Sequence, residues 1–216
     1  MVESPASLDI RAAYDTVAGD YARLLPDLRA ETSLDRAMLA TFAELTRTAA
    51  LGPVGDLGCG TGRVAAHLHS LGVDVFGVDV SPAMIAVARR TYPHLRFDTG
   101  SITDLQLPDA SLGGALAWYS TIHTPPQHLR GVFAEFARVL APGGYLLVGF
   151  HVGHGQRPIT QAYGHAVSFD AYDMTVEEVA KIAARAGLTI HTKLQRSAQG
   201  QEKRPQGSLI AAKPST

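Results

Sequence analysis

Apolar residues recur at intervals of three and four positions in the N-terminal quarter of the chain. This spacing places them on one face of a helix and predicts two helices, over residues 8–25 and 32–51, with Pro26 ending the first. From Val54 onward, short apolar runs alternate with segments of helical spacing. Such alternation is typical of βαβ units, in which helices cover both faces of a parallel sheet.

The alternating part of the chain predicts a sheet with helices between most of its strands and a polar loop between the last two. Five parallel strands are expected over residues 54–58, 73–79, 95–100, 113–120 and 144–151. Helices are expected over residues 62–72, 81–92, 127–140 and 175–187. The last two strands, 188–196 and 207–214, are joined by a polar loop, so we expect an antiparallel pair that closes one sheet edge. Residues 152–173 have no regular pattern and predict a long functional loop.

Length and composition predict one domain over residues 1–216, with N-terminal helices or a lid (1–51) and a cofactor-binding α/β core (52–216). The net charge of -1 gives no reason to expect a nucleic-acid partner. No signal-peptide pattern begins the chain, and no apolar run approaches the roughly 20 residues that span a bilayer. We therefore expect a cytoplasmic protein without a membrane partner. The single cysteine, Cys59, excludes an internal disulfide.

The stretch "VGDLGCGTGRVAAHL" (54–68) carries closely spaced glycines between a predicted strand and a predicted helix. Glycines there let a ligand touch the backbone, although plain tight turns also use them. Asp79 ends the next strand, 21 positions after Gly58, where a carboxylate can accept hydrogen bonds from both ribose hydroxyls. Asp79 could instead cap the next helix, but Ser81 is already suited to that position. These residues predict a nucleotide site.

The glycine spacing and Asp56 indicate which nucleotide fits. The loop reads G-x-G-x-G, whereas the dinucleotide fingerprint is G-x-G-x-x-G. A carboxylate at Asp56 would repel a pyrophosphate and attract an ammonium group. The pattern therefore favours a nucleotide with an amino-acid tail over the nicotinamide cofactor of an oxidoreductase.

Four blocks of this sequence resemble the successive motifs of class I S-adenosylmethionine-dependent methyltransferases of the small-molecule type. The blocks are "DLGCGTG" (56–62), "GVDVSPAMIAVA" (77–88), "LQLPDASL" (105–112) and "FARVLAPGGYLLV" (136–148). The resemblance covers residues 8–214. It implies an α/β fold with a Rossmann-like, doubly wound, seven-stranded sheet, mostly parallel with strand 7 antiparallel, and an N-terminal helical lid. It also implies methyl transfer from S-adenosylmethionine to O, N or C of a small molecule.

The resemblance assigns parts of the cofactor to particular positions. Gly58 and Gly60 match the loop against the methionine part, Asp56 would orient the ammonium, and Asp79 would bind the ribose. The family often has Gly-Asp after strand 3, and the acid accepts a hydrogen bond from the adenine amino group. This chain has Ser101 in place of that acid, and the serine hydroxyl can still accept a hydrogen bond. Asp98 is better explained as a residue at the end of the strand than as a substitute for the acid. The expected cofactor-binding residues are Tyr14, Asp56, Gly58, Gly60, Asp79, Val80, Met84, Ser101, Ile102 and Trp118.

The methyl acceptor is expected at the carboxyl ends of strands 4 and 5, because ligands of open parallel sheets bind there. His123 is the first candidate for a general base, and a wall of the pocket is its alternative role. The "HVGHG" spacing, without a matching acid, does not favour a metal site. The expected substrate-binding residues are Tyr21, Tyr119, His123, His151 and His154.

Two further interpretations remain open at the level of sequence. Tyr14 and Tyr21 lie seven positions apart on one helical face, which a lid over the site and a packed core explain equally well. Aromatic residues at Trp118, Tyr119 and Tyr163 favour an apolar or aromatic acceptor.

The alternatives to methyl transfer are a nucleotide-binding module without turnover and a methyltransferase-fold protein that uses the cofactor for another reaction, such as a cyclisation. The sequence does not indicate an oligomeric state.

Overall fold

The elements alternate between strand and helix through most of the chain in the computed structural model, which describes residues 5–215. Residues 1–4 and 216 of the predicted single domain lie outside this range. The helices are α1 (Pro5–Leu24), α2 (Ser33–Ala49), α3 (Arg63–Ser70), α4 (Pro82–Thr91), α5 (Pro126–Val139) and α6 (Val176–Arg185), with short 3-10 turns η1 (Leu28–Ala30) and η2 (Thr121–His123). The strands are β1 (Val54–Leu57), β2 (Val75–Asp79), β3 (Arg96–Thr99), β4 (Leu112–Trp118), β5 (Leu140–His151), β6 (Gly155–Ala162), β7 (His165–Asp173), β8 (Thr189–Arg196) and β9 (Gln206–Ala212).

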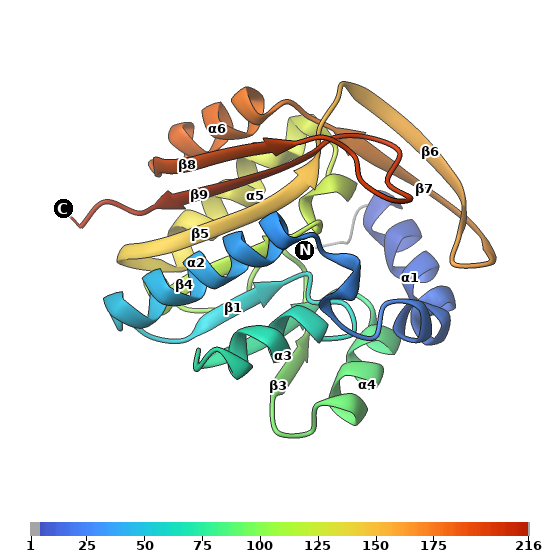
Figure 1. Cartoon of the computed structure of the whole chain (residues 1–216), viewed down its shortest axis with the longest axis horizontal. Helices are drawn as coiled ribbons and strands as arrows, with labels where there is room; N and C mark the ends of the chain where they lie inside the picture. Colours follow the sequence, from blue (N-terminus) through green and yellow to red (C-terminus); the bar gives the residue numbers. More distant parts are fainter. Residues whose placement is uncertain (1–4, 216) are drawn as a thin grey trace.

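The main sheet has seven strands in the order β3-β2-β1-β4-β5-β9-β8 (Figure 1). Strands β1 to β5 pair in parallel, and β9 runs antiparallel to both β5 and β8. The predicted fold class is therefore confirmed, including the antiparallel pair at one edge. The strand order reverses beside β1, and ligands of such sheets bind at this switch point.

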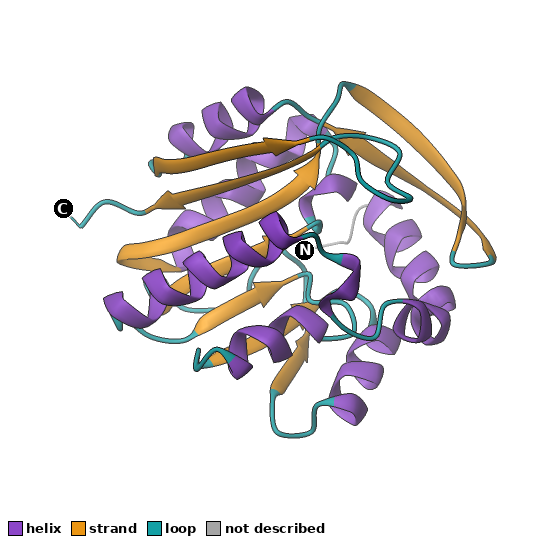
Figure 2. Cartoon of the chain, viewed as in Figure 1, coloured by secondary structure: helices purple, strands orange, loops and turns teal. Residues whose placement is uncertain are grey.

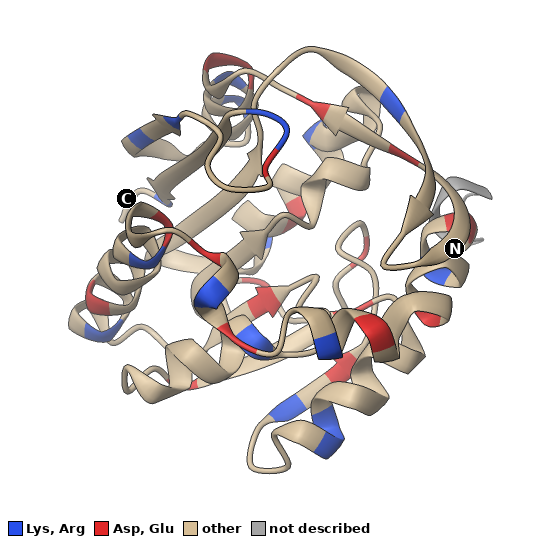
Figure 3. Cartoon of the chain, turned by 45° about the vertical axis from the view of Figure 1, so that its right-hand side comes forward, with Lys and Arg blue, Asp and Glu red and all other residues tan. Residues whose placement is uncertain are grey.

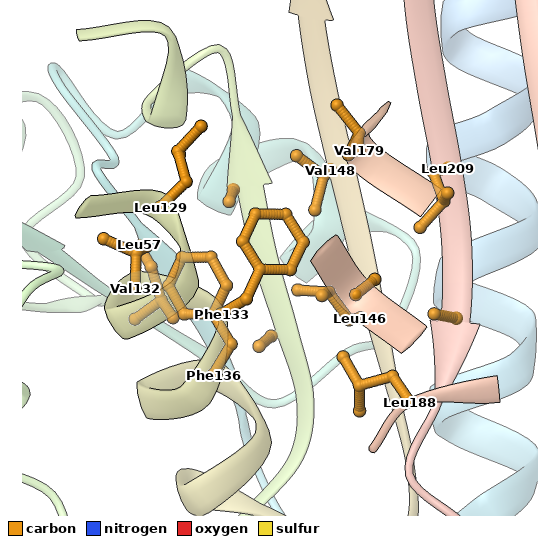
Figure 4. Packing of buried hydrophobic residues seen from close by; sticks show 14 of the residues in the cluster. Leu57, Leu129, Val132, Phe133, Phe136, Leu146, Val148, Val179, Leu188 and Leu209 are labelled. Carbon is orange, nitrogen blue, oxygen red and sulfur yellow. The ribbon is translucent and has the colours of Figure 1, made fainter. Parts of the chain in front are cut away.

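Helices cover both faces of the sheet (Figure 2). One face packs against α2, α3 and part of α4, while the other packs against α5 and α6. Burial on both faces explains the continuous apolar runs of β4 and β9, in which every residue is buried. Figure 4 shows the second layer from close by: Phe133 and Phe136 of α5 pack toward Leu146 and Val148 of β5.

The prediction of a long irregular loop over residues 152–173 is wrong. Most of this segment forms an antiparallel hairpin of β6 and β7, which extends away from the main sheet and lies along α1 (Figure 1). Its two-residue turn consists of Tyr163 and Gly164, with φ angles of 52° and 86°. Two positive φ values suit a tight hairpin turn, because their twist matches that of the strands.

The helices formed by residues 5–215 include none that is both long enough and apolar enough to cross a bilayer. Lys and Arg residues are interspersed with Asp and Glu over the view in Figure 3.

Candidate active site

A cavity of about 990 Å³ opens at the carboxyl ends of β1, β2, β4 and β5, beneath α1. Small-molecule sites commonly measure roughly 300–1,000 Å³, so this one has room for a nucleotide and a second small molecule. The structure brings almost all predicted site residues together here. The predicted residues that line the cavity are Tyr14, Tyr21, Asp56, Gly58, Gly60, Asp79, Val80, Met84, Ser101, Ile102, Trp118, Tyr119, His123 and His151. His154 is exposed and lies outside this lining.

The glycine loop after β1 is shaped by two different steric requirements. A Cβ on Gly58 would lie 2.2 Å from the Cβ of Ser120, so the close approach of the segment just after β4 excludes any side chain there. Gly60 has a φ of 54°, and nothing lies within 4 Å of its hypothetical Cβ. Gly60 therefore presents bare backbone to the cavity, as a ligand in close contact with the loop requires.

Asp79 ties the end of β2 to this loop. Its Oδ2 accepts a hydrogen bond from the Gly60 N–H at 2.8 Å, and its Oδ1 accepts one from the Ser81 N–H at 2.9 Å. Burial raises the pKa of this carboxyl, and the two backbone donors oppose that rise. Each oxygen keeps a free lone pair, so Asp79 can still accept hydrogen bonds from two neighbouring hydroxyls. Ser81 caps α4, since its hydroxyl accepts from the Met84 N–H.

Asp56 carries a buried oxygen that has no partner among the described residues. Only 1% of Asp56 is exposed, and its Oδ2 makes no hydrogen bond with any residue that the structure describes. Burial raises the pKa of Asp56 to about 7, although the nearby charge of Arg63 opposes the rise. Buried polar atoms are almost always paired. An unpaired carboxylate oxygen at a cavity wall is therefore suited to a cationic ligand group.

Tyr14 and His123 form a half-buried pair between α1 and the segment after β4. The Tyr14 hydroxyl lies 2.7 Å from His123 Nε2, and His123 Nδ1 lies 3.4 Å from the Asp170 carbonyl oxygen. A carbonyl can only accept, so Nδ1 carries the ring proton and Nε2 accepts the proton of Tyr14. Burial lowers the pKa of His123 to about 4, which keeps the imidazole neutral. Phe169 packs edge-on against His123, with ring centroids 5.1 Å apart.

The region expected to cover an adenine combines apolar and polar groups. Val80 and the fully buried Met84 line the cavity beside Ser101 and Ile102. The Ser101 hydroxyl shares a hydrogen bond with the Thr103 hydroxyl at 2.8 Å. Asp104, which the sequence did not single out, also lines this end of the cavity. Its carboxyl group is therefore an acidic group at the end of the cavity where this chain lacks a Gly-Asp pair.

The opposite wall contains an ion pair that sequence reasoning missed. Arg63, directly after the glycine loop, pairs with Glu31 at 2.7 Å, and both side chains are at least 90% buried. Glu31 also accepts from Trp118 Nε1 at 3.4 Å. Tyr21 lies near Arg63 and helps to raise its pKa, and it packs edge-on against the ring of Tyr163, with ring centroids 4.9 Å apart. The position of Arg63 beside the glycine motif was the available signal, but nothing in the sequence identifies Glu31 as its partner.

His151 and Tyr119 lie at the end of the cavity near the β8–β9 loop. Their ring centroids are 5.3 Å apart, and Tyr119 has a φ of 59°, which is rare for a residue with a side chain. His151 Nδ1 lies 3.3 Å from an Arg157 Nη2. Within residues 5–215, no group of three or more His, Cys, Asp or Glu side chains is arranged to hold a metal ion.

Comparisons with known proteins agree with this geometry. The family described as a methyltransferase domain matches residues 54–144, from β1 into β5. A demethylmenaquinone methyltransferase from Beutenbergia cavernae is 31% identical over 163 residues, which cover 71% of this chain and 67% of that protein. An O-methyltransferase from Pyrenophora dematioidea is 37% identical over 100 residues. These cover 43% of this chain, and this chain spans only 37% of that protein.

The fold is also shared with a solved structure. The 1,6-didemethyltoxoflavin-N1-methyltransferase from Burkholderia thailandensis superposes with a TM-score of 0.67 at 19% identity, covering 99% of this chain and 93% of that one. At this identity the likeness shows the fold alone, whereas the 31% identical relative matches over two thirds of its own length. This chain belongs to the S-adenosylmethionine-dependent methyltransferases, the enzyme family whose methyl donor is S-adenosylmethionine.

Proposed function

We propose that this protein methylates a hydroxyl group of a small, largely apolar molecule, and that Tyr14 and His123 remove the proton of that hydroxyl. The observation that carries the proposal is the 2.7 Å contact between Tyr14 and His123, in the wall of the cavity that the residues expected to bind the cofactor also line. The O-methyltransferase relative and the aromatic walls support the same class of acceptor.

The residues present fit S-adenosylmethionine. The unpaired Oδ2 of Asp56 can accept a hydrogen bond from an ammonium group, and Gly60 leaves open space for the methionine part. Asp79 retains lone pairs for the two ribose hydroxyls, while Val80 and Met84 offer an apolar surface for the adenine. When bound, the cofactor would supply a methyl group on a sulfonium, and an in-line nucleophile would take that methyl group while the sulfur leaves as a neutral thioether.

Tyr14 and His123 can carry away the acceptor proton in two linked transfers. The acceptor hydroxyl would donate its proton to the Tyr14 oxygen, while the Tyr14 proton moves to His123 Nε2. The pKa of His123 is about 4, so the imidazole is a weak base but is free to accept. A weak base is sufficient, because an oxygen that is gaining a methyl group becomes strongly acidic. The Asp170 carbonyl would stabilise the resulting imidazolium through Nδ1–H.

The experiment that tests this function is a label-transfer screen. The protein is incubated with S-adenosylmethionine that carries an isotopic label on its methyl group, together with pools of small metabolites. We expect labelled products methylated on oxygen and equal amounts of S-adenosylhomocysteine. Binding of S-adenosylhomocysteine without label transfer to any pool would favour a binding module. Labelled products methylated only on carbon would contradict the assigned role of Tyr14 and His123.

A further inference from the structure

A cluster of cationic side chains lies at the end of the cavity, outside the positions assigned to the cofactor. Arg204 and Lys203, from the loop between β8 and β9, both line the cavity, as does His151 at the end of β5. Arg157 of β6 lies behind His151. None of these cationic groups has a part in the proposed cofactor site or in proton removal.

The charges of this cluster do not cancel. Arg157 and Arg204 share one carboxylate, Asp173, with nitrogen–oxygen distances of 2.9 Å and 3.3 Å. Arg157 holds both oxygens of Asp173 through Nε and Nη2, so the stronger, two-pronged interaction belongs to Arg157. Within residues 5–215 no side chain accepts a hydrogen bond from the guanidinium of Arg204, and no carboxylate lies within ion-pair distance of Lys203.

His151 adds a hydrogen-bond donor to these charges. An arginine has donors only, so His151 Nδ1 must accept from the Arg157 Nη2 at 3.3 Å. The ring proton therefore sits on Nε2, on a side chain that lines the cavity. Burial and the charge of Arg157 lower the pKa of His151 to about 4, which keeps this tautomer neutral. His151 thus offers an N–H group rather than a basic nitrogen.

The other carboxylates nearby have their own partners. Both oxygens of Glu202 accept from Arg196 at 2.6 Å, and Oδ1 and Oδ2 of Asp35 accept from the same guanidinium at 3.0 Å and 2.7 Å. The carboxylate of Asp170 in β7 accepts from the Gln156 amide at 2.8 Å in a solvent-exposed hydrogen bond. These carboxylates place negative charge near the cluster, but the hydrogen-bond donors left for a ligand are those of Arg204, Lys203 and His151.

We infer that this end of the cavity recognises an anionic oxygen group on the methyl acceptor, such as a carboxylate, with Arg204 as the main specificity-determining residue. The inference rests on the proposed function, because it assigns the acceptor side of the same cavity. An arginine fork matches the two oxygens of a carboxylate, and His151 Nε2–H and Lys203 add donors from the side. The acceptor is then a hydroxylated organic acid with an apolar body.

The test compares two small probes that differ in charge but hardly in shape, benzoate and benzamide. Trp118 is the only tryptophan and lines the cavity, so quenching of its fluorescence reports binding there. Titrations are made on the full chain, with and without saturating S-adenosylhomocysteine. One charge-assisted hydrogen bond corresponds to roughly tenfold in affinity, so we expect benzoate to bind at least about tenfold more tightly than benzamide.

Variants assign the preference to the cluster. Arg204→Gln should bring the affinities for the two probes close together, Arg204→Lys should restore part of the difference, and Lys203→Gln should reduce it. Lys181→Gln removes one positive charge from the exposed face of α6, outside the cavity lining, and should leave the preference unchanged. If Arg204→Gln does not fold, the test rests on Lys203→Gln, which should reduce the preference for benzoate over benzamide.

Equal affinities of the wild-type protein for the two probes would overturn the inference, as would a preference that survives both cavity variants. Failure of the proposed function has a different signature. In that case S-adenosylhomocysteine does not bind or no label is transferred, while the preference for benzoate, measured without S-adenosylhomocysteine, still reports on the anionic subsite.

Discussion

Tyr14 and His123 are 109 positions apart in sequence, and their contact depends on α1 lying over the end of β4. In the mechanism that we propose, the two side chains share one proton-transfer route, so removing either should interrupt it. Positioned proton transfer contributes roughly 100- to 10,000-fold to rates, and we expect Tyr14→Phe and His123→Gln each to lower kcat about 100-fold. The double variant should be no slower than either single variant, because the two residues act as one unit.

Steady-state kinetics with an acceptor identified by label transfer measures this effect, and calorimetry checks that S-adenosylhomocysteine still binds. Tyr172→Phe is the matched control, since Tyr172 lies on β7 outside the cavity lining. Wild-type kcat in both Tyr14→Phe and His123→Gln would remove the pair from the mechanism.

Asp56 predicts a pH dependence of cofactor binding. Its pKa is raised to about 7, so the carboxyl is mostly protonated below pH 7 and ionised above it. Only the ionised form attracts an ammonium group, and the dissociation constant of S-adenosylhomocysteine should therefore rise as the pH falls from 7.5 to 5.5. The limiting slope is about tenfold per pH unit for one linked proton.

Calorimetric titrations at several pH values measure that slope. Asp56→Asn keeps the shape of the side chain but cannot ionise, so it should bind S-adenosylhomocysteine more weakly and with an affinity that no longer follows pH. A wild-type affinity that stays constant from pH 5.5 to 7.5 would show that Asp56 is not the partner of the ammonium.

At the scale of elements, α1 is held over the cavity by consecutive residues that reach opposite sides of it. Tyr14 contacts His123 on the side that we propose for the acceptor, while Asp15 contacts the start of α4 on the side that we propose for the cofactor. The Asp15 Oδ1 accepts from the Ser81 hydroxyl at 2.6 Å and from the Ala83 N–H at 3.0 Å. A carboxylate at a helix N-terminus is also favoured by the helix dipole.

We expect Asp15→Ala to loosen the lid without unfolding the core. The loss of a capping interaction costs about 1 kcal/mol, or roughly fivefold in the population of the closed lid. The variant should show a several-fold higher KM for S-adenosylmethionine and faster proteolysis within α1, with an unchanged thermal midpoint. Asp9→Ala, at an exposed position of the same helix, is the matched control. An Asp15→Ala variant with wild-type KM and proteolysis would show that this contact does not position the lid.

The β6–β7 hairpin, which packs along α1, could not be predicted from the sequence. Pro158 within β6 argues against a strand, and the turn "AYGHA" lacks the Asn-Gly or Asp-Gly pair that indicates a hairpin. Pro158 is tolerated because β6 pairs with one strand only. By contrast, the glycine loop and Asp79 were recognisable because their spacing is local. The partners of Arg63 and Arg204 come from distant segments, so no local pattern contains them.

At the scale of the whole molecule, the βα alternation was sufficient to predict the sheet and the edge at which the cavity opens. It did not predict the ion pairs that connect the last strands to the N-terminal helices. Arg196, at the end of β8, pairs with Asp35 in α2 and with Glu202 in the following loop. The side chains of Arg196 and Asp35 are only 4% and 6% exposed. This network joins the N-terminal helices, the sheet edge and the loop that carries Arg204.

Replacing Arg196 with Met is therefore expected to destabilise the whole fold at neutral pH. Removing one partner of a buried ion pair leaves an uncompensated charge, which typically costs about 3–5 kcal/mol of the free energy of unfolding. Lys193→Met removes an exposed ion pair with Glu177 from the same strand and should cost at most about 1 kcal/mol. Urea denaturation at pH 7 measures both.

The pH dependence of the Arg196→Met variant distinguishes a lost ion pair from lost packing. In the wild type, hydrogen bonds from Arg196 hold the pKa of Glu202 below its ordinary value. Its stabilisation is therefore present at neutral pH and is lost as the pH falls through that lowered pKa. Without Arg196 the ionised form of Glu202 is no longer favoured in the folded state, so the gap in the free energy of unfolding between variant and wild type should narrow as the pH falls from about 5 to about 3. A gap that stays constant over this range would mean that Arg196 acts through packing of its aliphatic stem rather than through its charge.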